Sequence, residues 1–418
     1  MDYFHSVTLD ATKCRGCISC VKRCPTEAIR VKDGKATIIN ERCIDCGECI
    51  RVCPHHAKKA VFDKLSMLDN YEYKIAMPAP ALYGQFNNLD NVDYILNGLL
   101  NIGFDDVFEV ARAAELVSEC TRKILSQPDC PKPLISSACP AIVRLIRVRF
   151  PKLIPHLLDV RAPVDIAADI ARREAIKKTG LPSEKIGVFF ISPCPAKVTA
   201  MRQPLAGEIT QMDGVLAISD VYKPLLSAMN KIQQPKALAE CGLTGISWSY
   251  TGGEATSLLN SRYLAADGME NVIKILEEIE DDKLQDLDFV ELGACVSGCV
   301  GGCLTIENPY IARTRVRHLR KYLPVSNNHI RDFELEPKEY NLKGPVEYSP
   351  VMQLDTDLMR AMQKMQEIQK IESGLPGIDC AACGSPSCHA FAVDVVEGSA
   401  KRSDCLILLK NRLKDIME

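Results

Sequence analysis

Twenty cysteines are the residues of this 418-residue chain most suited to chemistry, because most of them are grouped at intervals of two or three residues. The N-terminus shows no basic stretch followed by an apolar run, and no segment of about 18 apolar residues could span a bilayer. We therefore expect a cytoplasmic chain without a membrane span. In that reducing compartment, grouped thiols serve as metal ligands far more often than as disulfides.

Two of the cysteine groups lie near the N-terminus and share the spacing C-x2-C-x2-C-x3-C-P. This spacing matches that of bacterial two-cluster ferredoxins, in which the fourth cysteine of each run binds the cluster of the other run. The predicted ligands are Cys14, Cys17, Cys20 and Cys53 for one [4Fe-4S] cluster, and Cys43, Cys46, Cys49 and Cys24 for the second. Residues 1–70 are therefore predicted to form a ferredoxin-like module, with a turn at Asp33-Gly34 before a short strand.

A separate group near the C-terminus reads Cys380-x2-Cys383-x4-Cys388-x16-Cys405. A close triplet and a distant cysteine let the chain wrap around one cube, so these thiols are predicted to hold a further [4Fe-4S] cluster. Before this group, apolar residues recur at helical intervals and predict a long helix that packs on the central domain or binds a partner. Residues 346–418 are predicted to form a small helical iron–sulfur domain.

Between these ends, residues 71–345 alternate apolar strands with amphipathic helices, which predicts an α/β domain with mainly parallel sheets. Three of the predicted strands run into a cysteine, at Cys139, Cys194 and Cys295, and Cys299 follows the last of these. Ligands bind at the carboxyl ends of strands in open α/β sheets, and a proline after a cysteine suits a turn into a helix. We expect these four thiolates to converge on one [4Fe-4S] cube; the alternative is that each is a small buried apolar residue.

The stretches around these cysteines resemble the three active-site motifs of the [FeFe]-hydrogenases. They read Cys139-Pro140, Pro193-Cys194-Pro195-Ala196-Lys197 and Glu291-x3-Cys295-x2-Gly298-Cys299-x-Gly301-Gly302. The resemblance implies an H-cluster, in which Cys299 bridges the cube to a di-iron unit that bears CO, cyanide and an azadithiolate. It also implies that Lys197 donates a hydrogen bond to a cyanide, and that the backbone near Pro193 contacts other diatomic ligands.

The third motif contains further candidate site residues. Gly298 permits close approach of the backbone to a bulky inorganic group. Glu291 opens the motif and is a candidate catalytic residue, and Cys303 lies within it and could line a di-iron pocket. The cysteines outside all these groups, which are expected to be buried or incidental thiols, are Cys120, Cys130 and Cys241.

The chain departs from the catalytic members of that family at positions that handle protons. Ala138 stands where they have a cysteine that relays protons, and Ala200 stands where the second motif usually ends in a glutamate of the same relay. Gly293 replaces a methionine that packs against the di-iron unit. Alanine cannot exchange protons, so these replacements imply slow H2 chemistry. The combination resembles the divergent, sensory-type branch of the family.

Two hypotheses for the function follow. The first is reversible H2 oxidation and proton reduction with an altered relay, in a low-turnover enzyme or H2 sensor that belongs to a larger redox complex. It requires redox partner proteins or subunits, and maturation proteins to build the di-iron unit. The second is an electron-transfer or scaffold subunit that holds only [4Fe-4S] clusters, as in Narf-like proteins. The net charge of −3 offers no basic footprint, so nucleic acid is not an expected partner.

Overall fold

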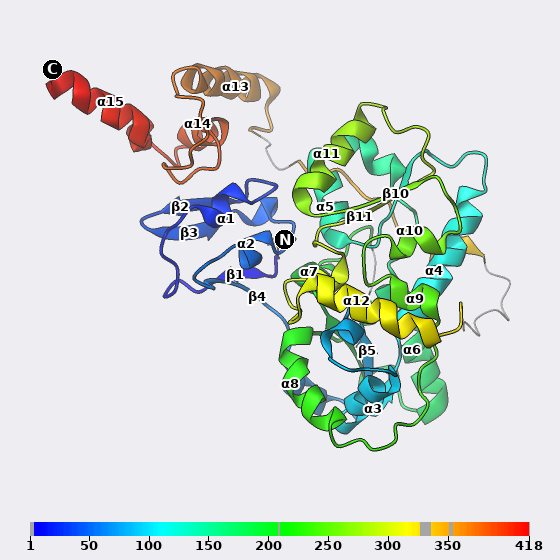
Figure 1. Cartoon of the computed structure of the whole chain (residues 1–418). Helices are drawn as coiled ribbons and strands as arrows, with labels where there is room; N and C mark the ends of the chain where they lie inside the picture. Colours follow the sequence, from blue (N-terminus) through cyan, green and yellow to red (C-terminus); the bar gives the residue numbers. More distant parts are fainter. Residues whose placement is uncertain (1–3, 208–209, 327–335, 351–353, 418) are drawn as a thin grey trace. The chain divides into compact units, whose positions relative to one another are not determined.

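The chain divides into two units in a computed structural model that describes residues 4–207, 210–326, 336–350 and 354–417. One unit joins the two ends of the chain, Met1–Ala60 and Ser349–Glu418, and the other spans Val61–Tyr348 (Figure 1). The N-terminal and C-terminal cysteine groups therefore lie in one unit, while the three hydrogenase-like motifs lie in the other.

The N-terminal part of the first unit is built from two antiparallel strand pairs and two short helices. The pairs are β1 (Val7–Leu9) with β4 (Lys58–Ala60) and β2 (Ile29–Lys32) with β3 (Lys35–Ile38), and the helices are α1 (Ser19–Lys22) and α2 (Glu48–Arg51). The predicted turn connects β2 to β3. Asp33 and Gly34 have φ values of +49° and +71°, and a two-residue hairpin turn of type I′ requires positive φ at both positions. This is the ferredoxin-like module.

The C-terminal part of the first unit is helical. Its helices are α13 (Leu358–Glu372), α14 (Cys388–Val396) and α15 (Leu406–Met417). The side chain of Asp357 accepts a hydrogen bond from the backbone N–H of Arg360 at 2.9 Å and so caps the start of α13. The segment between α13 and α14 contains the first two cysteines of the C-terminal triplet, and the third is the first residue of α14.

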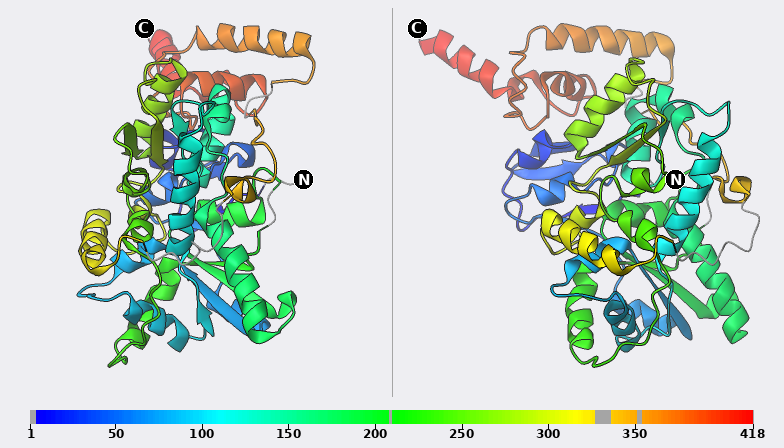
Figure 2. Two further views of the ribbon diagram at one scale, coloured as in Figure 1. Left: turned by 90° about the vertical axis from the view of Figure 1, so that its right-hand side faces the viewer. Right: turned by 45° about the vertical axis from the view of Figure 1, so that its right-hand side comes forward.

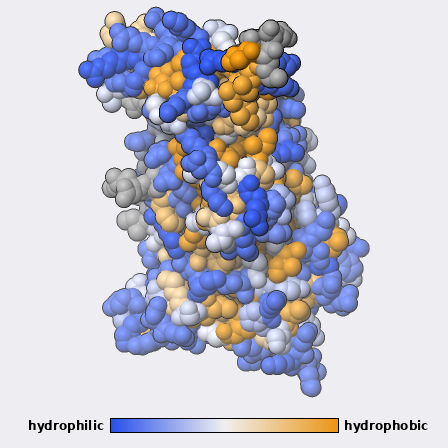
Figure 3. All heavy atoms as spheres, turned by 90° about the vertical axis from the view of Figure 1, so that its left-hand side faces the viewer, coloured by the Kyte–Doolittle hydropathy of each residue, from blue (hydrophilic) through white to orange (hydrophobic). Residues whose placement is uncertain are grey.

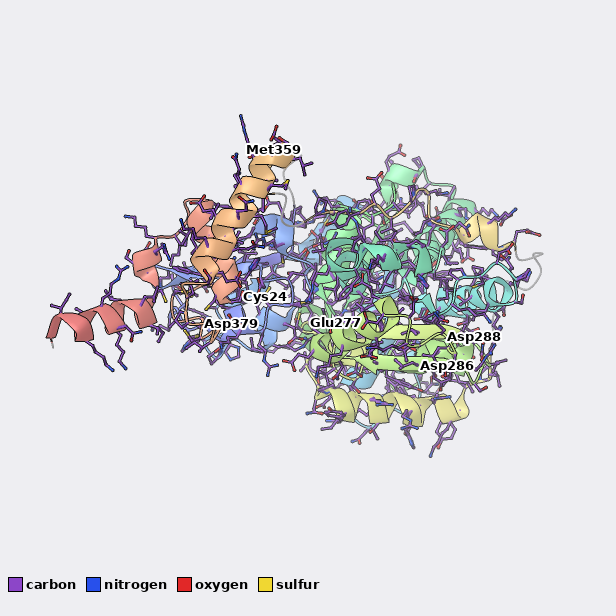
Figure 4. The ribbon with its side chains drawn as sticks, turned by 90° about the horizontal axis from the view of Figure 1, so that it is seen from above. Cys24, Glu277, Asp286, Asp288, Met359 and Asp379 are labelled. Atoms are coloured by element: carbon purple, nitrogen blue, oxygen red, sulfur yellow. The ribbon has the colours of Figure 1, made fainter. Side chains whose placement is uncertain are left out.

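The apolar stripe of α13 is only partly buried. Ile368 and Ile371 pack against α14, and the packing of this helix on the central domain stays a prediction. Met359, Met362 and Met365 remain exposed at the other end of the stripe, and Figure 4 labels Met359 on the outer part of the helix. Apolar patches among hydrophilic residues are also visible on the face drawn in Figure 3.

The second unit contains two parallel sheets. The larger has the strand order β6-β5-β8-β9 and the smaller has the order β10-β11-β7. Their strands are β5 (Tyr73–Pro78), β6 (Asp106–Val107), β7 (Leu134–Ile135), β8 (Ile186–Ser192), β9 (Gly214–Ala217), β10 (Tyr263–Asp267) and β11 (Phe289–Gly293). All the strand pairs of both sheets are parallel, as the alternation of strands and helices predicted.

Helices cover both faces of the larger sheet (Figures 1 and 2). Side chains alternate along β8, so Val188 and Phe190 enter one hydrophobic core, while Phe189 and Ile191 enter the core on the opposite face. The helices of this unit are α3 (Asp93–Asn101), α4 (Val110–Leu125), α5 (Pro140–Arg149), α6 (Pro163–Thr179), α7 (Pro195–Arg202), α8 (Ile218–Met229), α9 (Leu243–Ser247), α10 (Gly253–Ser257), α11 (Met269–Glu280) and α12 (Pro309–Leu319). Among the helices that the structure describes in either unit, none is long and apolar enough to cross a bilayer.

Substitution of Phe189 tests how much the packing of β8 side chains in these cores contributes to the stability of the unit. Its ring is fully buried and makes edge contacts with Tyr71 and Phe104, at centroid distances of 5.5 and 6.3 Å. We expect Phe189→Ala to lower the free energy of unfolding of this unit by about 3–5 kcal/mol, because it leaves a cavity in a packed core. The exposed Tyr310 is the control, and Tyr310→Ala should change the stability by less than about 0.5 kcal/mol in denaturant titrations. Equal effects of the two substitutions would contradict this assignment.

Candidate metal centre

The cysteines of the first two motifs occupy equivalent turns. Cys139 is the N-cap residue of α5 and Cys194 is the N-cap residue of α7, and a proline follows each at the first helical position. Proline suits this position because it has no N–H to leave unpaired and its fixed φ is already helical. The two turns follow strands of different sheets, β7 and β8, so both sheets contribute to the centre.

The third motif is the loop that follows β11. Cys295 lies two residues beyond the strand, and Cys299 opens a short 3-10 turn (η6, Cys299–Gly301). The loop packs tightly on the second motif: a Cβ atom added to Gly302 would lie 2.2 Å from the carbonyl oxygen of Pro193. The backbone N–H of Leu304 donates to the same oxygen at 2.9 Å. Glycine at position 302 is therefore a steric requirement of this loop.

All four cysteines line one cavity, with a volume of about 140 Å³. They are close enough for their charges to interact: burial, and then the neighbouring Cys295 and Cys139, raise the pKa of Cys194 to about 12. Burial and the other three thiols raise the pKa of Cys299 well above its usual range. Cys299 lines this cavity and has an exposed side chain. The convergence predicted from the sequence is present.

Lys197 joins the first two motifs. It lies in the first turn of α7, lines the cavity, and donates from Nζ to the backbone carbonyl of Ala138 at 3.1 Å. Its positive charge lowers the pKa of Cys299 in opposition to the larger effect of burial. Pro193 and Gly298 also line the cavity, as predicted. Cys303 is not among the lining residues, so the structure does not place it in the expected di-iron pocket.

Glu291 reaches from β11 to the start of α10. Its carboxylate accepts hydrogen bonds from the backbone N–H groups of Gly252 and Ala255, at 2.9 and 2.8 Å. Gly252 has a φ of +89°, and a Cβ on Gly253 would lie 1.7 Å from the carbonyl oxygen of Ser247. The geometry of Glu291 is that of a positioning residue, which fixes the Thr251-Gly252-Gly253 turn against the cavity.

Glu254 is a cavity residue that the sequence reasoning missed. Its side chain is 4% exposed, and its buried Oε1 atom has no hydrogen-bond partner among the residues that the structure describes. Oε2 accepts from the hydroxyl of Ser136 at 2.7 Å, and Ser136 Oγ accepts from the backbone N–H of Ala138 at 3.2 Å. Burial, and then the charge of Glu291, raise the pKa of Glu254 well above its usual range. Its position directly after two glycines was the available signal.

Comparison with known proteins shows the family to which this chain belongs. A family model described as "Iron only hydrogenase large subunit, C-terminal domain" matches residues 72–240 and 250–303, which is more than half of the chain. This chain belongs to the iron-only hydrogenase family. Two further models match outside this region: a 4Fe-4S dicluster domain at residues 6–54 and an Fe-S cluster domain at residues 375–407. The chain is thus an iron–sulfur protein with the hydrogenase fold.

Individual relatives include both hydrogenases and assembly factors. The periplasmic [Fe] hydrogenase large subunit of Nitratidesulfovibrio vulgaris is 30% identical over 47% of this chain and 51% of its own length. A probable cytosolic Fe-S cluster assembly factor of Drosophila ananassae is 23% identical over 66% of this chain and 64% of its own length. The structure of [FeFe]-hydrogenase HydA1 from Chlamydomonas reinhardtii aligns with 69% of this chain and 98% of that chain, with a TM-score of 0.54 and 18% identity. The chain spans about half the length of the curated hydrogenase.

The structure also brings together the cysteines of the other three groups. Cys24 joins the second N-terminal run, and all members of this set line a common cavity: Cys24, Cys43, Cys46 and Cys49. The C-terminal set likewise lines one cavity: Cys380, Cys383, Cys388 and Cys405. In the remaining set, Cys20 interacts electrostatically with Cys17 and Cys53, and Cys14 lies in the same core. The pairings are those of the two-cluster ferredoxin pattern.

The donor sets of this iron-only hydrogenase family member fit iron–sulfur cubes. Three of the sets offer four thiols around one cavity, the members of the fourth set lie close to one another, and thiolates are the ligands that iron in such cubes takes. In the central set, Cys299 is the exposed member, and the other three thiols line the same cavity. The cysteines outside the sets have other surroundings: Cys241 donates to Oε1 of Glu109 at 3.0 Å, and Cys120 is fully buried in a hydrophobic core.

The close contact of Gly302 with Pro193 leads to a prediction for iron binding. Gly302→Ala should push the third motif away from the second and reduce iron binding by up to about four atoms per chain, because the central set can no longer close on a cube. Gly293→Ala is the matched control, since its Cβ would meet its nearest neighbour, the Cβ of Asp267, at an ordinary 3.8 Å. Iron analysis after reconstitution measures both. Full iron content in Gly302→Ala would show that the loop contact is dispensable.

Proposed function

We propose that this chain carries an H-cluster in the central cavity and catalyses the reversible conversion of H2 into two protons and two electrons at a low rate. The observation that supports this is the convergence of four thiols from two sheets on one cavity, among which Cys299 has an exposed side chain. Cys139, Cys194 and Cys295 would bind the cube, and Cys299 would bind it and bridge to a di-iron unit. When bound, the di-iron unit supplies the open iron site at which H2 is formed or split.

Lys197 would serve the site in two ways. Its hydrogen bond to the carbonyl of Ala138 holds α7 against the first motif and fixes the separation of Cys139 and Cys194. Its ammonium group also places a positive charge beside the four thiolates and is a charge-assisted donor for an anionic ligand in the cavity. An uncharged side chain at this position would leave the negative charge of the site uncompensated.

Proton transfer would use Glu254 in place of the missing cysteine relay. Ala138 carries no exchangeable side-chain proton, whereas the hydroxyl of Ser136 and the carboxyl of Glu254 form a hydrogen-bonded pair two residues from it in the same cavity wall. The raised pKa of Glu254 favours the protonated form of its carboxyl group, whose O–H can donate a proton and whose other oxygen can accept one. A buried carboxyl group with one free oxygen is suited to this task.

Substitution of Glu254 tests this relay. Glu254→Gln should lower H2 turnover of the matured protein by about 100-fold, which is a typical contribution of one proton-transfer group, while the iron content stays unchanged. The amide preserves the hydrogen bond to Ser136 and is neutral, as the protonated carboxyl group already is. Ala138→Cys, which supplies a thiol at the position of the missing relay, should raise turnover. Unchanged turnover in Glu254→Gln would eliminate Glu254 from the relay.

The three other cysteine sets would each hold a [4Fe-4S] cluster and carry electrons between the centre and a redox partner protein. Together with the central cube they would give four clusters. We further propose that the chain acts as a subunit of a larger redox complex, in which slow turnover serves H2 sensing or a small electron flow. H2 and protons are the small-molecule substrates, and maturation proteins would deliver the di-iron unit.

The second candidate is a scaffold or electron-transfer subunit that holds only [4Fe-4S] clusters. Its support is the match to a cytosolic Fe-S cluster assembly factor over two thirds of this chain, together with alanine at position 138. Under this proposal the same thiols bind a cube, and the space beside Cys299 holds no further iron. Lys197 would then act only through its hydrogen bond to the first motif.

Infrared spectroscopy of the protein after anaerobic maturation separates the two candidates. An H-cluster gives CO and cyanide stretching bands and raises the iron content from about sixteen atoms per chain, for four cubes, to about eighteen. Cys194→Ala should abolish the bands and remove about four to six iron atoms, because the central cube and whatever it bridges are lost together. Absence of the bands at an iron content of about sixteen would refute the H-cluster and support the scaffold.

A further inference from the structure

The C-terminal module is fixed to the ferredoxin-like module by a buried ion pair. Arg30 of β2 donates from Nε to Oδ2 of Asp394 in α14 at 2.5 Å, and both side chains are 4% exposed. The same carboxylate oxygen accepts from the hydroxyl of Ser385 at 2.6 Å. Because a buried charge that loses its partner is strongly destabilising, this pair sets the position of α14 on β2.

Backbone contacts extend this interface to the cysteine loop of the C-terminal module. The N–H of Val31 donates to the carbonyl of Gly384 at 2.9 Å. Gly384 has a φ of +89°, and a Cβ atom there would lie 1.9 Å from the carbonyl oxygen of Val31. The residue next to Cys383 thus lies against β2 with no room for a side chain.

The neighbours of the other two cysteines of the triplet contact the same stretch of chain. Lys22 donates from Nζ to the backbone carbonyl of Asp379, the residue before Cys380, at 2.9 Å. The hydroxyl of Ser387, the residue before Cys388, donates to Glu27 at 3.1 Å. Figure 4 labels Asp379, whose carbonyl accepts this bond from Lys22 of α1, and Cys24.

Residues 22–31 therefore contact the chain beside every cysteine of the C-terminal triplet. Cys24 is the single cysteine in this stretch, and it lines the cavity of the second N-terminal set together with Cys43, Cys46 and Cys49. The backbone N–H of Ala28 points at the Sγ atom of Cys24, at 3.2 Å. The interface thus connects two sets of thiols through one short segment of hydrogen-bonded chain.

We infer that the C-terminal cluster exchanges electrons directly with the cluster of the Cys24 set, which makes the C-terminal module an electron entry or exit site of the ferredoxin-like module. The inference rests on the proposed function in one respect, that each set holds a [4Fe-4S] cluster. In each transfer one cluster loses a single electron and the other gains it, and no bond or proton is exchanged. Electron transfer weakens steeply with distance, so a contact beside every cysteine of the triplet favours this route.

Electron paramagnetic resonance of the full-length, reconstituted chain reduced with dithionite tests the inference. Two reduced clusters that lie close together broaden each other's signals. The signal that is lost in Cys388→Ala is that of the C-terminal cluster. In Cys46→Ala, which removes the cluster of the Cys24 set, that signal should become narrow and isolated. In Cys17→Ala, the matched variant of the other N-terminal set, it should stay broadened. The reverse pattern, or an isolated signal in the unmodified chain, would overturn the inference.

Asp394→Ala tests the same inference through the interface. It should sharpen the C-terminal signal with no loss of iron, whereas Glu397→Ala, at the exposed C-cap residue of the same helix, should leave the spectrum unchanged. Cys46→Ala could also remove the cluster of the other N-terminal set, and in that case the spectrum of Asp394→Ala is the deciding measurement. A C-terminal signal that stays broadened in Asp394→Ala would refute the inference. Failure of the proposed clusters is distinguishable, because iron content and visible absorption would then be low in the unmodified chain.

Discussion

The repulsion between thiolates that meet in a confined cavity is the constraint on which the central unit depends. Cys139, Cys194, Cys295 and Cys299 come from three remote turns, and each additional negative charge in that space opposes the others. A cationic iron core stabilises such a set, and Lys197 contributes a single positive charge toward the same balance. Metal binding and folding of the three loops would therefore be coupled, because a bound iron core would relieve the repulsion that opposes their convergence.

The scaffold around the cavity meets this constraint with rigid turns and close backbone contacts. Two cysteines are N-cap residues whose following prolines fix the start of a helix, and Gly302 brings the third motif against Pro193. Glu291 uses its carboxylate to hold the turn before α10. These contacts position the loops around the cavity that the four thiols line.

Local signals in the sequence predicted much of this arrangement. The apolar runs before Cys139, Cys194 and Cys295 form β7, β8 and β11, all in parallel sheets, and the prolines begin helices where expected. These features depend on residues within one turn or strand, so spacing reveals them. Distant contacts were not predictable: Glu254 meets Ser136 across 118 positions, and Arg30 meets Asp394 across 364. For the same reason, the packing of α13 on α14 and the absence of Cys303 from the cavity lining emerged only with the structure.

The most direct test of the central claim is an anomalous difference map at the iron absorption edge, from crystals of the matured protein grown without oxygen. The account predicts a cube of iron density in contact with the sulfur atoms of Cys139, Cys194, Cys295 and Cys299, and a second iron site adjoining Cys299 alone. Iron density that these four cysteines do not share, or a central cavity free of iron in a protein whose other sets are filled, would contradict it.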